Sequence, residues 1–350
     1  MRAPHAPSGN VLVGRAPWHA QAPQEESVEA SIQAGLAGIH PRAEAHVQAS
    51  RDADRGRADA RALADARRAD AQALVDLQAQ AGVAFVSDGL LGWQDLFRPF
   101  AERTPGLRVG PLTRWFDNNT FYRRPIVERA VQHPEPVAPS FDAGAKLPKG
   151  TQGKAILPGP YTFARLADDR AYGSVEKLLT ALARDVLAPE VRDLAQRGVG
   201  WVQFSEPALL KERPQPEEWE ALQRGYLAIL DGVRITSCVH AGFGDASRQL
   251  QELFDLPVDY IGLDFTETPL DAFEDFQPTR GLQAGLADAR SSIVESAEEL
   301  AAAAQDLLDL AEPPALALAP SAELEYLPRA VADAKGQALG AAAKLLGGQP

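Results

Sequence analysis

The stretch WVQFSEPALLKERPQPEEWEALQRGYLAILDGVRITSCV, residues 201–239, decides the fold. It starts with an apolar run at 201–204, continues through a helical pattern at 216–230, and ends in a β-branched run at 234–239. Short apolar runs bounded by turn residues are typical of buried parallel strands. The stretch therefore predicts a strand–helix–strand unit, in which the helix returns the chain to the start of the next parallel strand.

The same alternation runs through the rest of the chain. Further apolar runs predict strands at Asn10–Gly14, Val83–Ser87, Ala155–Pro158, Tyr260–Asp264, Leu282–Leu286 and Ala315–Ala319. Further helical patterns occupy 174–197, 246–254, 297–310 and 327–346. Strands and helices in this alternation predict an α/β protein with a (β/α)8 TIM barrel. A doubly wound open sheet is the alternative, but none of these strands is followed by a G-x-G-x-x-G or G-x-x-x-x-G-K motif.

Two long segments interrupt the alternation in the first half of the chain. Residues 41–80 are rich in Ala, Arg and Asp and predict an N-terminal helical extension with a solvated face. Charges of both signs alternate along 51–70, which indicates ion pairs on that face rather than a binding patch. Residues 91–154 follow the second strand and are too long for a plain loop. We expect this insertion near the C-terminal mouth of one elaborated barrel that comprises residues 1–350.

The composition excludes several classes of protein. The chain has 350 residues and a formal net charge of −13, which argues against a nucleic-acid partner. No apolar run reaches the roughly 20 residues that a membrane helix needs. The first residues lack the apolar core of a signal peptide, so we expect a cytoplasmic protein that does not contact a membrane. The single cysteine, Cys238, excludes a disulfide within the chain and any site built from several thiolates.

Polar side chains follow the predicted strands, which is where TIM barrels place their chemistry. The residues found there include Asp88, Thr162, Ser205, Glu206, Asp264, Ser321 and Glu323. We take the carboxylates of Asp88, Glu206 and Asp264 as candidates for acid–base catalysis, and Thr162 and Ser205 as candidates for substrate binding. Each of them alone is better explained as a helix cap or a turn residue. Their convergence on one mouth favours a functional site.

Cys238 and His240 are two residues apart, so on an extended strand their side chains share one face. A zinc ion held by Cys238, His240 and one carboxylate, Asp264 or Glu267, would keep a fourth position for a substrate thiolate or water. The alternative is that the thiol is inert packing and the imidazole is a hydrogen-bonded loop residue. The spacing alone leaves both interpretations open.

The insertion contains the sequence RWFDNNTFYRRP at residues 114–125. Polar Asp117 and Asn118 stand there between aromatic residues that include Trp115 and Tyr122, and such a set suits an aromatic or heterocyclic ligand. The alternative is a packed hairpin whose aromatic residues form a small core and whose polar residues make the turn. We name these four residues as candidates for substrate binding.

Several motifs together resemble the cobalamin-independent methionine synthase family. RWFDNNTFY at 114–122, LPGPYTF at 157–163 and WVQFSEPAL at 201–209 are similar to family signatures, and LAPSAELEYLP at 318–328 follows in the family's order. The resemblance implies a barrel enzyme of methionine biosynthesis. Such enzymes move a methyl group to the thiol of homocysteine from a corrinoid or a reduced folate, as in 5-methyltetrahydropteroyltriglutamate–homocysteine methyltransferases. It also implies a zinc ion, held in the family by a His-x-Cys pair, a Glu and a later Cys, which keeps the substrate sulfur as a thiolate.

The chain departs from the family's zinc site. It has Ser237 and Val239 where the family has His and Cys, and Asp264 where the family has Glu. The later Cys falls on Ala322, in a segment that looks more like the family's first, zinc-free barrel. The rearranged set described above could supply ligands, but it requires a one-residue shift in which side chains face the mouth, and such a shift exchanges the faces.

Three functions remain open on the sequence. The first is an S-methyltransferase that acts on homocysteine or a related thiol, with Glu206 on the substrate's amino group. The second is a zinc-free barrel that serves as the binding or partner subunit of a separate catalytic barrel protein. The third is a metal-free lyase or decarboxylase, like the uroporphyrinogen decarboxylase group, with acid–base work by Asp88, Glu206 and Asp264. The resemblance favours the first two.

Overall fold

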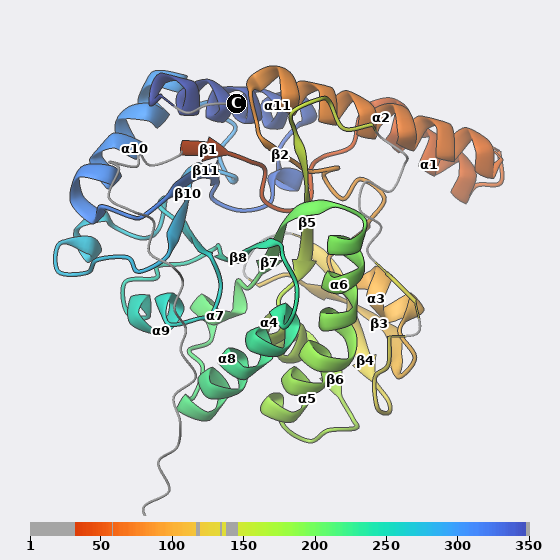
Figure 1. The fold of residues 1–350 in the computed structure, drawn as a ribbon. Coiled ribbons are helices and arrows are strands. Elements are labelled where there is room, and N and C mark those ends of the chain that lie inside the picture. Colours follow the sequence, from red (N-terminus) through yellow and green to blue (C-terminus); the bar gives the residue numbers. More distant parts are fainter. Residues whose placement is uncertain (1–31, 58, 117–119, 134, 138–145, 348–350) are drawn as a thin grey trace, which may run out of the picture.

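Eight parallel strands form a nearly closed barrel with helices around it (Figure 1). The computed structural model describes residues 32–57, 59–116, 120–133, 135–137 and 146–347. The barrel strands are β1 (Ile32–Ala34), β2 (Phe85–Val86), β5 (Gln152–Pro158), β7 (Val199–Ser205), β8 (Thr236–Ala241), β9 (Tyr260–Asp264), β10 (Gly281–Ala287) and β11 (Leu316–Pro320). They are joined in the order β1-β11-β10-β9-β8-β7-β5-β2, and each neighbouring pair is parallel. The TIM barrel predicted from the sequence is therefore confirmed.

The strands agree with the sequence prediction from Val83 onward, and β9 has the predicted bounds. The predicted strand at Asn10–Gly14 lies outside the described residues. The first place in the barrel belongs to β1, which pairs with β11, so that assignment is corrected. The three residues of β1 escaped the sequence analysis because so short a segment does not stand out as an apolar run.

Helices follow the strands and cover the barrel from outside. Their bounds are α1 (Glu44–Asp54), α2 (Ala60–Ala81), α3 (Arg98–Arg103), α4 (Pro160–Leu166), α5 (Val175–Leu182), α6 (Ala188–Gln196), α7 (Ala208–Lys211), α8 (Pro216–Leu230), α9 (Leu250–Phe254), α10 (Ala297–Ala311) and α11 (Arg329–Leu345). Ser296 and Glu299 form a capping box that starts α10, and α2 stops at Gly82, whose φ of 89° suits glycine. Within the described ranges, no helix is long and apolar enough to cross a lipid bilayer.

Helices α2 and α11 lie side by side (Figure 1) and share a buried ionic network. Arg329 of α11 donates to Asp70 of α2 at 2.5 Å and to Asp333 at 2.8 Å. The same carboxylates bond the rings of His46 and His40, at 2.9 and 2.8 Å. The network joins the N-terminal extension to the last helix, on the side of the barrel where β1 pairs with β11.

The insertion after β2 contains an antiparallel hairpin. Its strands are β3 (Leu107–Arg114) and β4 (Phe121–Val127), and a third short strand pairs with β4, namely β6 (Asp168–Asp169). Trp115 and Tyr122 are buried at the hairpin's tip, where their rings contact each other and the ring of Phe97. The hairpin with a small aromatic core is therefore present. The predicted turn residues Asp117 and Asn118 lie outside the described residues.

Alternate side chains of the barrel strands point into the interior. Trp201, Cys238 and Ala317 form an apolar layer there, and Phe85 and Tyr260 pack against it. Next to this layer lies a set of hydrogen-bonded polar side chains, which are Lys154, Gln203, His240 and Gln283. The buried carboxylates Glu206, Asp264 and Glu323 lie at the carboxyl ends of the strands, where the loops form the mouth.

Candidate active site

A pocket lies at the mouth of the barrel, between the tip of the hairpin and the segment that follows β11. Its empty space of about 270 Å³ includes volume that is open to solvent, so the enclosed part of the pocket is small. Aromatic rings and carboxylates share its walls, and its lining residues are Ile39, Asp95, Leu96, Trp115, Thr120, Phe121, Tyr122, Glu323, Glu325 and Tyr326. We call it the mouth pocket. It brings the aromatic motif of the insertion together with carboxylates that follow the last strand.

Glu323 and Glu325 supply the mouth pocket's acidic groups. Burial raises the pKa of Glu323 to about 7, and burial with repulsion from Glu323 and Asp95 raises the pKa of Glu325 to about 8. No other side chain among the described residues is hydrogen-bonded to either carboxylate. Gly38 has a φ of +88° and lies against Glu323, where an added Cβ would be 2.0 Å from Cγ. A glycine at position 38 therefore makes room for this carboxylate.

Trp115 lines the same pocket and has an unpaired donor. Its indole N–H is buried and has no acceptor in the part of the chain that the structure describes. Asp95, in contrast, is used by the fold, because its carboxylate accepts from the backbone N–H groups of Phe97, Arg98 and Arg123 at 2.8–2.9 Å. Unpaired buried groups cost free energy unless a ligand or water pairs with them. The mouth pocket thus has the features of a ligand site.

A second hollow, of about 610 Å³, carries positive charge. Its lining residues are Arg42, His46, Ser50, Asp54, Leu63, Arg67, Leu91, Gly92 and Gln94, and we call it the basic hollow. Arg42 donates to the carbonyl oxygens of Leu91 and Trp93, at 2.9 and 2.6 Å, so its guanidinium is fixed. The charge of Arg42 also lowers the pKa of Glu325 in the mouth pocket. Arg42 therefore connects an acidic and a basic site electrostatically.

Glu206 follows β7 and is fully buried. Its carboxylate accepts the first backbone N–H groups of α4, from Tyr161 at 2.9 Å and Thr162 at 2.6 Å, and the hydroxyl of Tyr226 at 3.0 Å. Burial raises its pKa to about 7, and these donors act in the opposite direction. An added Cβ on Gly159 would lie 2.0 Å from its carboxyl carbon. Glu206 therefore anchors the start of α4, and both oxygens are already used within the fold.

Three other predicted residues lie near the strand ends. Thr162 belongs to the Glu206 anchor, and its hydroxyl also accepts a backbone N–H from α7 at 3.2 Å. Ser205 is buried at the end of β7, opposite His240 of β8. Asp88 accepts the N–H of Leu90 at 3.0 Å in the turn after β2, and burial raises its pKa. Thr162 thus has a structural contact, and the proposed roles of Thr162, Ser205 and Asp88 stay predictions.

Asp264 ends β9 and is fully buried. Its Oδ1 accepts from the backbone N–H and the hydroxyl of Thr266, at 3.0 and 2.5 Å. Its Oδ2 has no hydrogen bond within the described chain and lies 3.6 Å from Nη2 of Arg290, which also binds Glu267 at 2.8 Å. Burial raises the pKa of Asp264. The carboxylate is held in place with one oxygen unpaired beside a cation.

Cys238 and His240 both point into the barrel, but they do not fit a zinc site. Burial raises the pKa of Cys238 to about 12 and lowers the pKa of His240 to about 4. The two ring nitrogens of His240 are within hydrogen-bond distance of Gln283 and of the carbonyl of Ser321. Zinc needs a thiolate and a free imidazole nitrogen, and neither is offered here. The described residues contain no group of three or more His, Cys, Asp or Glu placed to hold a metal ion.

The structure thus places the predicted site residues in different parts of the barrel. It brings Trp115 and Tyr122 together in the mouth pocket and places Glu206, Asp264 and Cys238 elsewhere. The sequence analysis listed Glu323 without giving it a role, and it did not identify Glu325. The signal was available, because acidic residues at a spacing of two directly follow the last strand.

A parallel barrel with ionisable side chains gathered at the carboxyl ends of its strands defines a (β/α)8 enzyme. The family model "Cobalamin-independent synthase, N-terminal domain" matches residues 104–312. The chain belongs to this family, as the motifs in its sequence predicted.

Relatives and solved structures agree with this assignment. The chain is 29% identical over 259 residues to a methionine synthase of Sulfurisphaera tokodaii, covering 72% of this chain and 74% of the relative. It is 30% identical over 246 residues to a 5-methyltetrahydropteroyltriglutamate–homocysteine methyltransferase of Bacillus licheniformis, covering 67% of this chain but 31% of that longer protein. A B12-independent methionine synthase from Shewanella sp. W3-18-1, solved with selenomethionine, shares the fold with a TM-score of 0.70 at 20% identity. That alignment covers 90% of this chain and 98% of the other.

Proposed function

We propose that this chain is a methyltransferase of the methionine synthase type, which binds a methylated reduced folate at its mouth and transfers the methyl group to the thiol of homocysteine. The observation that carries the proposal is the mouth pocket, where aromatic walls surround unpaired hydrogen-bonding groups. The pterin ring of a folate is flat, with adjacent N–H donors on one edge. A carboxylate accepts such a pair of donors, and aromatic faces hold the ring.

The pocket's size favours a folate over a corrinoid as the methyl donor. The empty space of about 270 Å³ includes volume open to solvent and is far too small for a corrin macrocycle, so a small flat ring is the better fit. Glu323 is the acceptor for the ring's N–H edge, because its carboxylate is buried and has no other side-chain partner among the described residues. The indole N–H of Trp115 is a donor for the ring's carbonyl oxygen or a ring nitrogen.

The basic hollow suits the other end of a folate. A folate carries a tail of one or more glutamates, and the name of the Bacillus relative specifies three. Arg42, His46 and Arg67 line the hollow, and arginine pairs well with carboxylates. The charge of Arg42 acts on Glu325 of the mouth pocket, which supports the proposal that the tail of a folate bound in that pocket is directed toward the hollow.

The transfer forms a bond between the thiol sulfur and the methyl carbon and breaks the bond between that carbon and the folate nitrogen. The proton that the thiol gives up must finally reach this nitrogen. Glu325, with a pKa raised to about 8, holds a proton at neutral pH and is the group we assign to deliver it. The ring is oriented by Glu323 and Trp115, which brings the methyl group to a defined position.

A second function, that of a folate-binding partner of a separate catalytic barrel, is favoured by two observations. The described residues offer no zinc site, and the matching family model is that of an N-terminal domain. For this second function, the mouth pocket binds the methyl donor in the same way, and the separate catalytic barrel activates the thiol.

The test is a methyl-transfer assay with 5-methyltetrahydrofolate carrying a labelled methyl group. Labelled methionine is measured with homocysteine and the purified chain alone, and then after adding a separately purified zinc-containing catalytic barrel of the family. Turnover by the chain alone supports the first function, and turnover that the chain stimulates in the mixture supports the second. No methionine above the level of the added barrel alone, in either arm, would refute both.

A further inference from the structure

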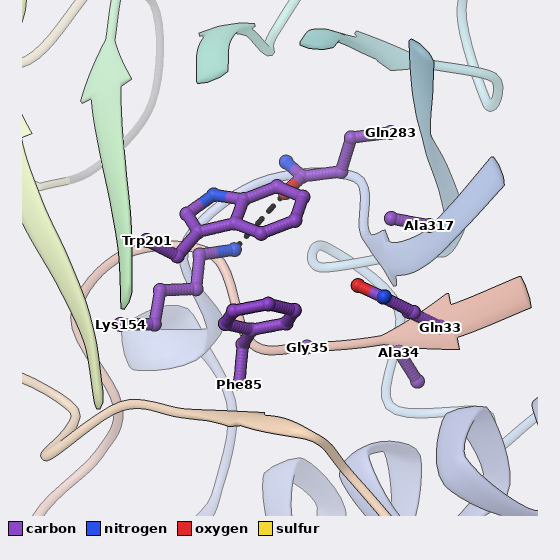
Figure 2. A pocket seen from close by; sticks show the side chains of 8 residues that line it. All are labelled: Gln33, Ala34, Gly35, Phe85, Lys154, Trp201, Gln283 and Ala317. Atoms are coloured by element: carbon purple, nitrogen blue, oxygen red, sulfur yellow. Dashed lines mark hydrogen bonds between the residues drawn. The ribbon is translucent and has the colours of Figure 1, made fainter. Parts of the chain in front are cut away.

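Lys154 of β5 lies inside the barrel, where the structure gives it no acidic partner among the described residues. It is 3% exposed, and its ammonium stands over the ring of Trp201, with Nζ 5.4 Å from the ring centre. Figure 2 shows it between Trp201 and Phe85, pointing toward the amide of Gln283. Nζ donates to Oε1 of Gln283 at 3.0 Å. A buried ammonium whose hydrogen-bond partner is a neutral amide costs free energy of folding.

The direction of the hydrogen bonds beyond Lys154 follows from chemistry. An ammonium can only donate, so Gln283 must turn its oxygen toward Lys154 and its NH₂ away from it. Nε2 of Gln283 lies 2.8 Å from Nδ1 of His240. Nδ1 of His240 must then accept, which places the ring's proton on Nε2 of His240. Nε2 lies 3.2 Å from the carbonyl oxygen of Ser321 and donates to it.

A glycine in the intervening strand makes this arrangement possible. Gly262 of β9 lies between His240 of β8 and Gln283 of β10 in the sheet register. An added Cβ on Gly262 would lie 2.5 Å from Nδ1 of His240 and 2.9 Å from Nε2 of Gln283. The two side chains meet across β9 because that position has no side chain.

The far end of the chain of hydrogen bonds reaches the mouth pocket. Ser321 directly follows β11, and Glu323 stands two residues later. The other contacts of Ser321 are with the β10 side, where its N–H donates to Ala287 and its hydroxyl accepts from Ala289. The bond from His240 therefore restrains the segment that carries Glu323 from the barrel interior.

We propose that Lys154 is a positioning residue that sets the tautomer of His240 through Gln283 and thereby holds the Ser321 carbonyl and the Glu323 wall of the mouth pocket in place. The ligand of that pocket rests on the proposed function; the tautomer does not. Each hydrogen bond from Lys154 through Gln283 to His240 has one permitted direction. A change at Lys154 should therefore change the protonation of the His240 ring.

The test measures the tautomer directly by NMR of protein labelled with ¹⁵N-histidine. Among the six histidines, His240 is assigned as the signal lost in His240→Asn. In the native chain we expect its proton on Nε2. In Gln283→Glu the new carboxylate can only accept, so Nδ1 should become protonated, while Nε2 still faces the carbonyl oxygen of Ser321. Lys154→Met should give a mixture of the two tautomers, because only the bond from Nε2 of Gln283 to Oε1 of Gln203, at 3.2 Å, then orients the amide.

Lys335→Met is the matched control, because Lys335 is a fully buried lysine of α11 that binds Glu295 and lies outside the barrel interior. It should leave the tautomer of His240 unchanged. An unprotonated Nδ1 in Gln283→Glu, or the native tautomer in Lys154→Met, would overturn the proposal.

The second readout is the affinity for 5-methyltetrahydrofolate, measured by calorimetry on the same proteins. We expect Gln283→Glu and Lys154→Met to weaken it about fivefold, the effect of roughly one hydrogen bond, and Lys335→Met to leave it unchanged. A shifted tautomer of His240 with native folate affinity would overturn the claim that His240 holds the Glu323 wall of the mouth pocket in place. If the native chain does not bind the folate, the proposed function fails, while the NMR result still decides the role of Lys154.

Discussion

Two glutamates at the mouth of the barrel, Glu206 and Glu323, look alike by most measures and differ in one. Each follows a barrel strand, each is more than nine-tenths buried, and burial raises the pKa of each to about 7. Glu206 accepts hydrogen bonds from two backbone N–H groups and a tyrosine hydroxyl. Glu323 receives no hydrogen bond from any other described residue. The partners of a carboxylate, rather than its burial or its pKa, separate an anchor of the fold from a group available to a ligand.

The largest expected effect is on stability, and it should separate the two glutamates. Glu206→Ala leaves two helix N–H groups and the hydroxyl of Tyr226 without their acceptor, and we expect it to lower the free energy of unfolding by about 3–5 kcal/mol. Glu323→Ala removes a buried carboxyl that bonds no other side chain, and we expect a change below about 1 kcal/mol. Urea denaturation measures both. Equal losses in the two variants would remove the distinction.

The next effect concerns ligand binding. Glu323→Gln should weaken binding of 5-methyltetrahydrofolate about tenfold, because an amide cannot accept two N–H donors as a carboxylate does. Glu298→Gln, an exposed change in the first turn of α10, is the matched control and should bind as the native chain does. Calorimetric titration gives the affinities. Native affinity in Glu323→Gln would show that this carboxylate does not touch the ligand.

The pH dependence of binding gives a sharper test of the same group. The pKa of Glu323 is raised to about 7, so the carboxylate that accepts the ring's N–H edge is protonated at pH 6 and ionised at pH 8. Affinity should therefore rise about tenfold between these pH values, which is the change in the ionised fraction. In Glu323→Gln this tenfold rise should be absent, and any change that remains belongs to Glu325, whose pKa of about 8 lies in the same pH range. A profile that falls with rising pH in the native chain would contradict the sign of this prediction.

The smallest expected effect comes from the indole of Trp115. Trp115→Phe keeps a ring in the wall and removes the N–H, so folate affinity should fall about threefold to fivefold, as for one neutral hydrogen bond. Trp219→Phe is the control, because its indole N–H is also buried without a partner in the described chain but lies outside the mouth pocket. If both variants bind equally well, Trp115 supplies only a surface for packing.

The sequence predicted the barrel because its strands are apolar and regularly separated by helices. Its strand-end rule also found real mouth residues, among them Glu206, Asp264 and Glu323. The sequence could not show which of these carboxylates would have their hydrogen bonds satisfied within the fold. The partners of Glu206 come from Tyr161, Thr162 and Tyr226, which are distant in sequence and meet it only once α4 and α8 pack together.

The barrel interior was harder to predict for the same reason. Cys238 and His240 share a face, as their spacing predicted, but their environment could not be read from that spacing. The tautomer of His240 depends on Gln283, which reaches it only because residue 262 is a glycine. The resemblance implied a zinc ion and the spacing of Cys238 and His240 offered two ligands, whereas the packing around the two side chains does not fit a metal site.

The central claim is that the mouth pocket binds the ring of the methyl donor, and a crystal structure of the chain with 5-methyltetrahydrofolate tests it most directly. We predict the pterin ring between the hairpin and the segment after β11, with its N–H edge on Glu323 and the indole N–H of Trp115 donating to it. We also predict the glutamate tail in the basic hollow, beside Arg42. A folate bound on Glu206 or Asp264, with Glu323 free of contact, would contradict the account.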